Sequence, residues 1–525
     1  MTPDEQWSHF SDSLLRYPNL GFSLDLSRID FTPGFDAGMA DACEKAFQHV
    51  AELESGSIAN PDEGRMVGHY WLRDSKLSPN ETIQGEIEEA ISSSKTFANR
   101  IHTGEILPPS GGQFESVLVI GIGGSALGPQ LAADALATPG AALNPYFLDN
   151  TDPDGIDRVM TEIGDGLAKT LAVVISKSGG TPETRNGMLE AIHAYEKAGL
   201  DFGKYAVAVT GPGSKLDKFA EAGGWMQRFS MPDWIGGRTS ITGIVGLVPA
   251  ALIGIDVDAF LEGAAAMDTH TRVPVVKENA AMQLALAWHH CGNGRGEKDM
   301  VVLPYKDRLV LFSKYLQQLV MESLGKEHDL NGNVVNQGIA VYGNKGSTDQ
   351  HAYIQQLRDG LNNFFATFIE VRRMRDGESP EVEDGVNSGD FLQGFLRGTR
   401  SALYGNNRES VTISVDDLDA RSLGALIALF ERAVTFYASL VNINAYHQPG
   451  VEAGKKAAAD FLDLLKNARE TLLASGTSTA AEISGKVDGN TEDIYHALNH
   501  LEANDPRVRA ERGSFPAEDR FSAAS

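Results

Sequence analysis

The stretch Ser116-Val-Leu-Val-Ile-Gly121-Ile-Gly-Gly-Ser125 decides the fold class of this chain. Its first five residues form a short apolar run rich in β-branched side chains, which predicts a buried strand. The glycines that follow predict a tight turn, and Ser125 opens a segment of helical character that continues to about residue 137. A strand, a glycine-rich turn and a helix in this order begin an α/β unit.

Similar apolar runs recur along the chain, separated by segments of helical length such as 181–199 and 307–324. Continuous apolar strands that alternate with helices indicate mainly parallel sheets covered on both faces. We therefore expect an α/β fold of two three-layer sandwiches, with mainly parallel sheets and helical N- and C-terminal extensions. The further strands expected are residues 143–148, 170–176, 204–210, 299–304, 338–342 and 363–371.

These patterns divide the chain into four regions. We expect a mainly helical N-terminal region at 1–110, a first α/β lobe at 111–291, a second lobe at 292–415 and a helical C-terminal region at 416–525. The residues after Asn504 are polar and are expected to be loosely held.

Composition excludes several classes of function. With 71 acidic and 45 basic residues the net charge is −26, which argues against nucleic acid and anionic membranes as partners. Cys43 and Cys291 cannot form a disulfide framework or a cysteine-rich zinc site, so we expect no metal and a reducing, cytoplasmic setting. The N-terminus has no secretion signal, and the apolar stretch 241–255 is too short to span a membrane and predicts a buried helix.

Two turns rich in glycine and hydroxyl groups are candidates for binding an anion. At Gly121–Ser125 and at Ser176–Thr181 a helix start follows a strand, so backbone N–H groups and the helix dipole can meet a phosphate. Two such helix starts on one sheet suit a single phosphate monoester. A plain tight turn and a plain helix cap are the alternatives. The loose Gly-x-Gly-x-x-Ala pattern with Asp149 also keeps a dinucleotide open.

Five side chains outside these turns are candidates for acid–base work or substrate contact. Arg238 follows two glycines, which would let its guanidinium reach into a cleft and stabilise an oxyanion. Gln318 and Glu322 are four residues apart and share one face near a helix C-terminus, where the dipole favours a protonated carboxyl group. His351 lies in a polar lead into a helix, and Lys455 near a helix start. Salt bridges and solvated faces are the ordinary explanations of such residues.

In this order, the segments resemble the glucose-6-phosphate isomerase (phosphoglucose isomerase) family, whose members are built from two sugar-isomerase (SIS) lobes. The resemblance spans about residues 115–460. The motifs that carry it are Gly121-Ile-Gly-Gly-Ser125, Ser176-Lys-Ser-Gly-Gly-Thr181, Gly236-Gly-Arg238, Met321-Glu-Ser-x-Gly-Lys326, Gln350-His351-Ala and Gln448-x-Gly-Val-Glu-x-Gly-Lys455.

The resemblance implies an aldose–ketose isomerase that interconverts glucose 6-phosphate and fructose 6-phosphate through a cis-enediol, without a cofactor or a metal. It implies that Glu322 is the base, that Arg238 faces the intermediate and that His351 opens the sugar ring with Lys455. It also implies a homodimer in which His351 enters from the neighbouring subunit, and a C-terminal region that completes the active site. The residues it implies for holding the sugar phosphate are Gly124, Ser125, Ser176, Lys177, Ser178, Thr181, Glu183, Gln318 and Gln448.

Three other functions stay open at this point. The chain could isomerise a related substrate such as mannose 6-phosphate, because the sequence does not set the preference between epimers. A non-catalytic SIS sugar-phosphate sensor would lack the base and the ring-opening histidine, yet both Glu322 and His351 are present. A nicotinamide-dependent oxidoreductase would use the Gly121 turn and Asp149. For a phosphate-binding function we expect a locally electropositive pocket on an acidic surface.

Overall fold

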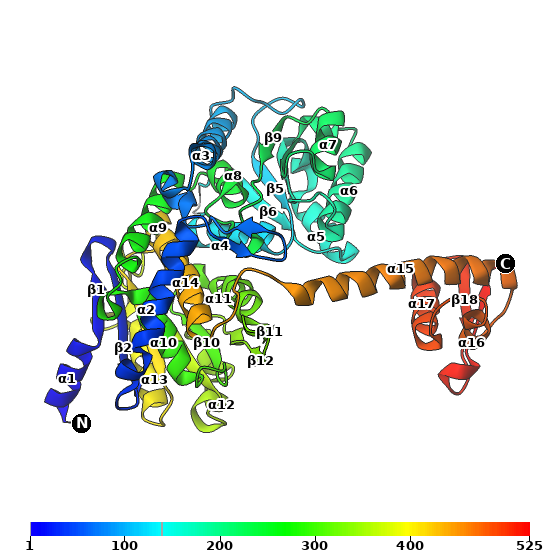
Figure 1. Cartoon of the computed structure of the whole chain (residues 1–525). Coiled ribbons are helices and arrows are strands. Elements are labelled where there is room, and N and C mark those ends of the chain that lie inside the picture. The colour runs from blue at the N-terminus through cyan, green and yellow to red at the C-terminus, as the bar shows by residue number, and fades with distance from the viewer. Residues whose placement is uncertain (1, 138–139, 525) are drawn as a thin grey trace. The chain divides into compact units, whose positions relative to one another are not determined.

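The computed structural model describes residues 2–137 and 140–524, with the backbone alone at 451–453. The chain forms two compact units, residues 1–447 and residues 448–525 (Figure 1). The larger unit contains two large sheets and three small hairpins among its described residues, and the smaller unit is helical with one β-hairpin. The α/β fold with mainly parallel sheets is as predicted.

The first sheet has the strand order β6-β5-β7-β8-β9, and all of its strands are parallel. Helices α3 and α8 lie on one side of this sheet and α6 and α7 on the other (Figure 1). The sheet consists of β5 (Ser116–Ile120), β6 (Asn144–Leu148), β7 (Thr170–Ile175), β8 (Ala206–Thr210) and β9 (Gln227–Ser230). The helices around it are α3 (Glu81–His102), α4 (Gly124–Leu136), α5 (Pro153–Ile163), α6 (Pro182–Lys197), α7 (Lys215–Ala222) and α8 (Ile244–Ile253).

This strand order places a topological switch point between β5 and β7. From β5 the chain crosses first to β6 on one side and then returns to β7 on the other. In open α/β sheets, a crevice forms outside the carboxyl ends of the two strands at such a point, and ligands bind there. The turns that begin at Gly121 and Ser176 are the two that follow β5 and β7.

The second sheet has the order β1-β2-β17-β14-β10-β13. Its four parallel strands repeat the switch-point order of the first sheet, with the switch point between β10 and β14. There Nζ of Lys306 donates to the carbonyl oxygens of Arg373 (3.1 Å) and Met374 (2.6 Å). The parallel strands are β10 (Asp299–Pro304), β13 (Val341–Tyr342), β14 (Phe364–Val371) and β17 (Ser410–Val415).

Both faces of the second sheet are buried. On β10, Met300 and Val302 belong to the main core, whereas Val301 and Leu303 pack with α13 (Ser388–Tyr404) through Leu396. Alternate side chains of a strand point to opposite faces, so helices cover this sheet on two sides. The second lobe therefore has the three layers that its continuous apolar strands predict.

The N-terminal region, expected to be mainly helical, also contributes two strands to the second sheet. Strands β1 (Leu14–Tyr17) and β2 (Phe22–Arg28) join the second sheet, with β2 antiparallel to β17. Strand β2 is buried on both faces, although its sequence does not predict this. Asp25 and Ser27 alternate with leucines, a pattern that is typical of a strand with one face in solvent. In the structure Arg400 bonds to both of these polar side chains beneath the sheet.

Helix α14 (Ala420–Leu440) is the central helix of the larger unit, although the sequence placed it in the C-terminal region. It packs against α2 (Phe35–Glu54), α9 (Val257–Thr271) and α10 (Ala280–Cys291). Among the described residues it is the one helix long and apolar enough to cross a membrane, and 89% of that apolar window is buried inside the protein. Burial of this kind is typical of a core helix.

The remaining elements of the larger unit are short or peripheral. The helices are α1 (Pro3–Asp12), α11 (Phe312–Leu316), a π-helix at Gln317–Glu322 and α12 (Ile354–Asp359). Three small hairpins pair β3 (Ile58–Asn60) with β4 (Arg65–Met66), β11 (Lys326–His328) with β12 (Val334–Gln337), and β15 (Glu381–Glu383) with β16 (Val386–Asn387).

The smaller unit has an apolar core of its own, which includes Ile483, Leu498 and Phe521. The polar tail is not loose: β18 and β19 form a hairpin, and Arg512 pairs with the buried Asp519. The unit consists of α15 (Pro449–Ser475), α16 (Ala480–Ser484), α17 (Thr491–Asn504), β18 (Val508–Glu511) and β19 (Arg520–Ala523).

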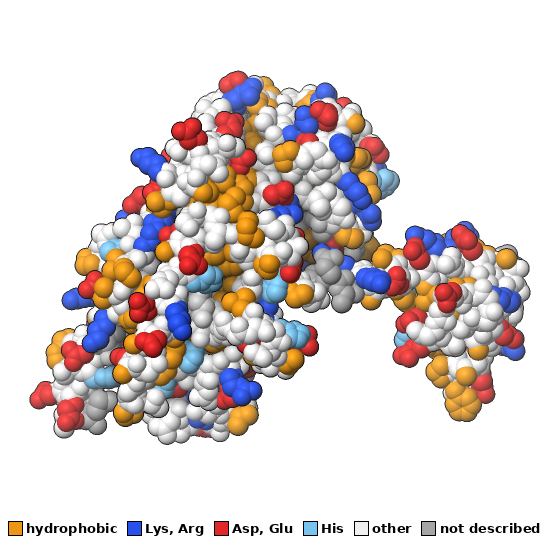
Figure 2. All heavy atoms as spheres, in the orientation of Figure 1, with side chains coloured by type: hydrophobic (Ala, Val, Ile, Leu, Met, Phe, Trp, Pro, Cys, Tyr) orange, Lys and Arg blue, Asp and Glu red, His pale blue; other side chains and the backbone are white. Residues whose placement is uncertain are grey.

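Charged side chains of both signs are interspersed over the face of the protein shown in Figure 2. Basic side chains on that face are scattered among acidic ones rather than gathered in a stripe. A nucleic-acid-binding protein would instead present clustered Lys and Arg.

Close contact between α9 and α14 generates a prediction about stability. A Cβ on Gly424 would lie 2.0 Å from the carbonyl oxygen of Phe260, and a Cβ on Gly263 would lie 1.8 Å from that of Arg421. We expect Gly424→Ala to lower the free energy of unfolding by about 1–3 kcal/mol, because the helices must separate. Urea unfolding followed by fluorescence checks this, since Trp288 packs against Phe430 of α14.

Gly398→Ala is the matched control for this substitution. Gly398 is exposed on α13 and has nothing within 4 Å of a built Cβ. There alanine should leave stability unchanged or raise it by up to about 1 kcal/mol through helix propensity. Equal stabilities for the two variants would contradict the close packing of α9 and α14.

Candidate active site

The first anion-binding turn depends on two adjacent glycines. Gly123 has φ +58°, a left-handed conformation that favours glycine, and α4 begins at the next residue. A Cβ on Gly124 would lie 1.9 Å from the carbonyl oxygen of Gly237. The start of α4, with Ser125 in its first turn, therefore lies directly against the turn that carries Arg238.

The second turn, Ser176–Thr181, is organised by its own hydroxyl groups. The N–H of Gly179 donates to Oγ of Ser176 (3.1 Å), and the N–H of Gly180 donates to Oγ of Ser178 (3.1 Å). Thr181 occupies the predicted N-cap position of α6, with Pro182 at the first helical position. In the described structure the Thr181 side chain makes no hydrogen bond to the helix it caps, so the N-terminus of α6 is available to an anion.

Lys177 connects this turn to the segment that precedes Arg238. Its ammonium donates to the carbonyl oxygens of Asp233 (2.6 Å) and Ile235 (3.1 Å). Burial lowers the pKa of Lys177, and the nearby Arg65 acts in the same direction. The ammonium thus stabilises the loops, and the hydroxyl and backbone groups of this turn are the donors that an anion could meet.

Arg238 is buried and contacts Glu322. It lies in a 3-10 turn (Gly237–Thr239), and its Nη1 donates to Oε1 of Glu322 at 2.7 Å. Its Nη2 donates to the carbonyl oxygen of Ala445 at 2.6 Å. Burial lowers the pKa of Arg238 and the Glu322 carboxylate opposes that shift, so the guanidinium stays charged.

Gln318 and Glu322 lie on a π-helix rather than on the α-helix that the sequence predicts. The expected helix at 307–324 divides into a 3-10 turn (Asp307–Leu309), α11 and the π-helix. Gln318 reaches the first turn, since a Cβ on Gly123 would lie 3.1 Å from its Nε2. The wider turn of a π-helix is frequent at functional sites, and here its Gln318 and Glu322 side chains both reach toward the first lobe.

The arrangement suits proton abstraction from an anionic substrate. A carboxylate and a fixed cation lie beside the carboxyl edge of the first sheet, where two helix N-termini can hold a phosphate. A carboxylate is a suitable general base, and a buried guanidinium stabilises the oxyanion that proton loss creates. Among the described residues, no group of three His, Cys, Asp or Glu side chains could hold a metal ion.

Comparisons with known proteins identify the family of this chain. Residues 37–405 and 396–483 match the sequence profile of the family described as "Phosphoglucose isomerase". The chain belongs to the phosphoglucose isomerase family. It is 59% identical over 504 residues to the glucose-6-phosphate isomerase of Thermosynechococcus vestitus (95% of each chain) and 56% identical over 522 residues to that of Geotalea daltonii (98% of each).

Solved structures with a similar fold also include a glucose-6-phosphate isomerase. A crystal structure of a glucose-6-phosphate isomerase from Chlamydia trachomatis aligns with a TM-score of 0.78 at 26% identity, covering 87% of this chain and 91% of that one. A hypothetical protein from Thermus thermophilus aligns with a TM-score of 0.69 at 28% identity, covering 83% and 99% of the two chains. The two-lobe architecture of the phosphoglucose isomerase family is thus present here.

Four predicted residues lie on elements other than those that carry the Arg238–Glu322 pair. His351 is exposed at the end of a 3-10 turn (Thr348–His351), and Glu183 lies in the first turn of α6. Gln448 is the N-cap residue of α15 and Lys455 lies in its second turn, so both belong to the smaller unit.

The sequence missed two parts of the site. One is the segment 444–447, whose carbonyl oxygens at Ala445 and His447 receive the guanidinium of Arg238. Backbone acceptors leave no trace in residue type, so no signal could have found them. The other is Lys326, whose buried ammonium reaches back to the carbonyl oxygen of Glu322 at 2.9 Å. Its signal was its position directly after the helix-ending Gly325.

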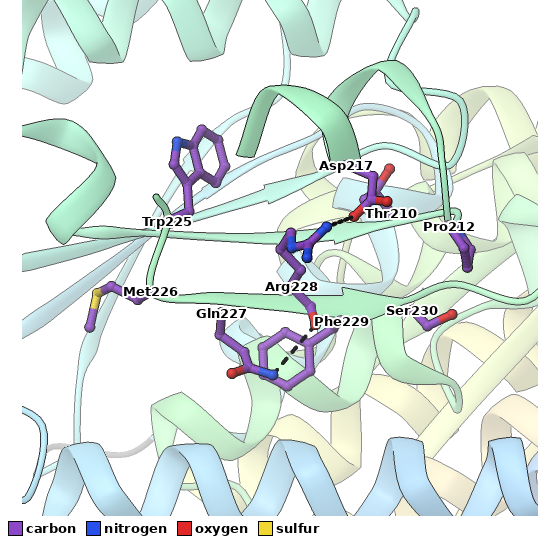
Figure 3. A pocket seen from close by; sticks show the side chains of 9 residues that line it. All are labelled: Thr210, Pro212, Asp217, Trp225, Met226, Gln227, Arg228, Phe229 and Ser230. Atoms are coloured by element: carbon purple, nitrogen blue, oxygen red, sulfur yellow. Dashed lines mark hydrogen bonds and ion pairs between the residues drawn. The ribbon is translucent and has the colours of Figure 1, made fainter. Parts of the chain in front are cut away.

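A groove of about 420 Å³ lies away from this pair, at the edge formed by β8, α7 and β9 (Figure 3). Arg228 crosses it to Asp217 at 2.8 Å and to Glu221 at 3.0 Å, so its cation is already paired with two carboxylates. Thr210 borders the groove and also donates to the carbonyl oxygen of Ser176. Thr210 thus connects the wall of the groove to the second turn. Among the described lining residues, the one carboxylate, Asp217, is paired with Arg228 and is not free to act as a base.

The contact between Gly124 and Gly237 generates a prediction about activity. We expect Gly124→Ala to lower kcat/KM for isomerisation by about 100-fold, because the methyl group must push the Arg238 turn away from α4. Steady-state kinetics measure this change. Gly85→Ala, on the exposed face of α3 where a built Cβ has nothing within 4 Å, should keep wild-type activity. A fully active Gly124→Ala enzyme would rule out this spacing requirement.

Proposed function

We propose that the chain interconverts glucose 6-phosphate and fructose 6-phosphate. The observation that carries the proposal is the 2.7 Å contact between the buried Arg238 and Glu322 beside the switch point of the first sheet. Membership of the phosphoglucose isomerase family and relatives named glucose-6-phosphate isomerase at 59% identity support the same substrate.

Phosphate binding comes first in the proposed mechanism. The N-termini of α4 and α6 and the hydroxyl groups of Ser125, Ser176, Ser178 and Thr181 would hold the phosphate, joined by the backbone at Gly124 and Lys177. The phosphate is remote from the reacting carbons of the sugar. Its binding energy can therefore orient C1 and C2 against the base.

Proton transfer then takes place at Glu322. Its carboxylate takes the proton from C2 of the open-chain aldose, the C–H electron pair forms the C1–C2 double bond, and the carbonyl oxygen on C1 becomes negative. Arg238 stabilises this cis-enediolate, and a proton moves from the C2 hydroxyl group to O1. The electron pair on O2 then forms the C2 carbonyl group, the C1–C2 double bond takes the proton back from Glu322 at C1, and the ketose results. Gln318 and Gln448 would line the sugar.

Ring opening needs a second acid–base group. We assign it to His351 with Lys455, which would protonate the ring oxygen and accept the O1 proton, and Glu183 would orient the histidine. His351 is exposed, which suits contribution to the site of a neighbouring subunit in a homodimer. Cys43 and Cys291 are buried and free, which suits the proposed cytoplasmic setting.

One observation argues against the dinucleotide alternative. Asp149 accepts a hydrogen bond from Nε2 of Gln130 at 2.8 Å and lies 3.7 Å from Nζ of Lys314. A carboxylate engaged in this way is not free to receive the two hydroxyl groups of a ribose. Mannose 6-phosphate stays a secondary substrate to be compared directly.

Glu322→Gln tests the reaction. We expect kcat for both glucose 6-phosphate and mannose 6-phosphate to fall by about 10²–10⁴-fold, because the amide cannot accept the C2 proton. A coupled assay of each substrate measures this. Glu327→Gln, at a side chain that is 70% exposed, is the control and should keep wild-type rates. An inactive wild type, or Glu322→Gln equal to wild type, would refute the assignment.

Mixing inactive variants tests the shared site. If His351 crosses the dimer interface, Glu322→Gln and His351→Ala subunits can assemble into heterodimers with one intact site. Random reassortment should then restore about a quarter of wild-type activity. Denatured and refolded mixtures, assayed against each variant refolded alone, provide the measurement. No recovery in mixtures shown to contain heterodimers would place the histidine in its own subunit's site.

A further inference from the structure

A buried lysine follows the helix that carries Glu322. Lys326 is only 5% exposed, although it lies at the first position of β11, between the exposed residues Gly325 and Glu327. Its Nζ donates to the carbonyl oxygen of Glu322 at 2.9 Å and to that of Ser323 at 2.7 Å. The side chain thus turns back under the helix end instead of extending into solvent.

These two acceptors are groups that a helix end leaves unsatisfied. The last four carbonyl groups of a helix have no partner within it, and they carry the negative end of the dipole. Gly325 satisfies one of them, because its N–H donates to the carbonyl oxygen of Met321 at 2.8 Å. Lys326 takes two more, and one belongs to Glu322 itself.

The charged groups around Lys326 are Arg238, which repels it, and Glu322, which attracts it, and Tyr446 in turn faces Arg238. Burial, together with the nearby Arg238, lowers the pKa of Lys326 to about 8, and Glu322 opposes this shift. An ammonium here has a large desolvation cost, because a second cation lies nearby. A neutral side chain of similar size could fill this space with a smaller desolvation free energy. The presence of a charge therefore suggests that the charge has a function.

We propose that Lys326 is a positioning residue for the Glu322 base. Its ammonium holds the last turn of the π-helix so that the carboxylate faces Arg238 and C2 of the substrate. The inference rests on the proposed isomerase function. With Arg238 and Lys326 around one carboxylate, the site also has an excess of positive charge when the enediolate forms.

Lys326→Met removes both the hydrogen bonds and the charge. We expect kcat to fall by about 10- to 100-fold while KM changes by less than about threefold, since the phosphate turns are untouched. The variant should also lack any decline of kcat above pH of about 8, because the group that titrates there is gone. Lys326→Arg keeps a cation and should recover most of the lost kcat.

Lys314→Met is the matched control. Lys314 lies on α11, directly before the π-helix, and its side chain is 49% exposed beside Asp149. Its loss should leave kcat and the pH profile as in wild type. Far-UV circular dichroism and calorimetric titration with inorganic phosphate establish that each variant is folded with working phosphate turns.

Two further measurements test the inference if the Lys326→Met variant does not fold. Lys326→Gln keeps a donor to the carbonyl groups and loses the charge, so its kcat should be lowered and should show no decline above pH of about 8. Wild-type kcat should decline above pH of about 8 as the ammonium deprotonates, and Lys326→Arg should remove that decline. An active wild type with an unchanged kcat profile in the folded Met or Gln variant would overturn this inference alone, whereas an inactive wild type would overturn the proposed function with it.

Discussion

The ion pair between Arg238 and Glu322 is the interaction on which the rest of the site depends, because its two members come from different lobes. Arg238 follows the last strand of the first sheet, and Glu322 lies in the first crossover of the second. A buried guanidinium is costly unless its donors are satisfied. Glu322 satisfies one Nη and the carbonyl oxygen of Ala445 the other, so three distant segments must meet for the charge to be tolerated. The glycine contact at Gly124 and the π-helix are the local means by which they meet.

Much of the fold could be predicted, because parallel strands buried on both faces leave continuous apolar runs. The strands that follow this rule, such as β5, β7 and β14, lie within one residue of the expected ranges. Strand β2 breaks the rule, since Asp25 beneath it is compensated by Arg400 from a helix far along the chain. Such pairing is a tertiary property that no local pattern carries. The same holds for α14, whose place in the core depends on α9 and α10 rather than on its own sequence.

The parts of the candidate site that consist of characteristic side chains close together in the sequence could be predicted. The parts that depend on backbone conformation or on backbone carbonyl groups could not. The glycine and hydroxyl content of the turns at Gly121 and Ser176 predicts an anion-binding role, and the two glycines before Arg238 predict that its side chain enters a cleft. A helical period of 3.6 cannot reveal that the helix widens into a π-turn before Glu322, nor that a carbonyl group at Ala445 receives the guanidinium. For Lys326 the sequence shows only that it follows a helix-ending glycine. The structure shows that its ammonium donates to the carbonyl oxygen of Glu322, a contact that residue type alone does not predict.

Four parallel strands have the same order in both sheets, but the two switch points differ. The first is followed by glycine-rich turns and helix starts, whereas at the second the ammonium of Lys306 donates to the carbonyl oxygens of Arg373 and Met374. The first lobe contributes Arg238 and both hydroxyl-rich turns, and the first crossover of the second lobe contributes Glu322. Two halves with the same strand order at the core of their sheets thus supply different parts of one site.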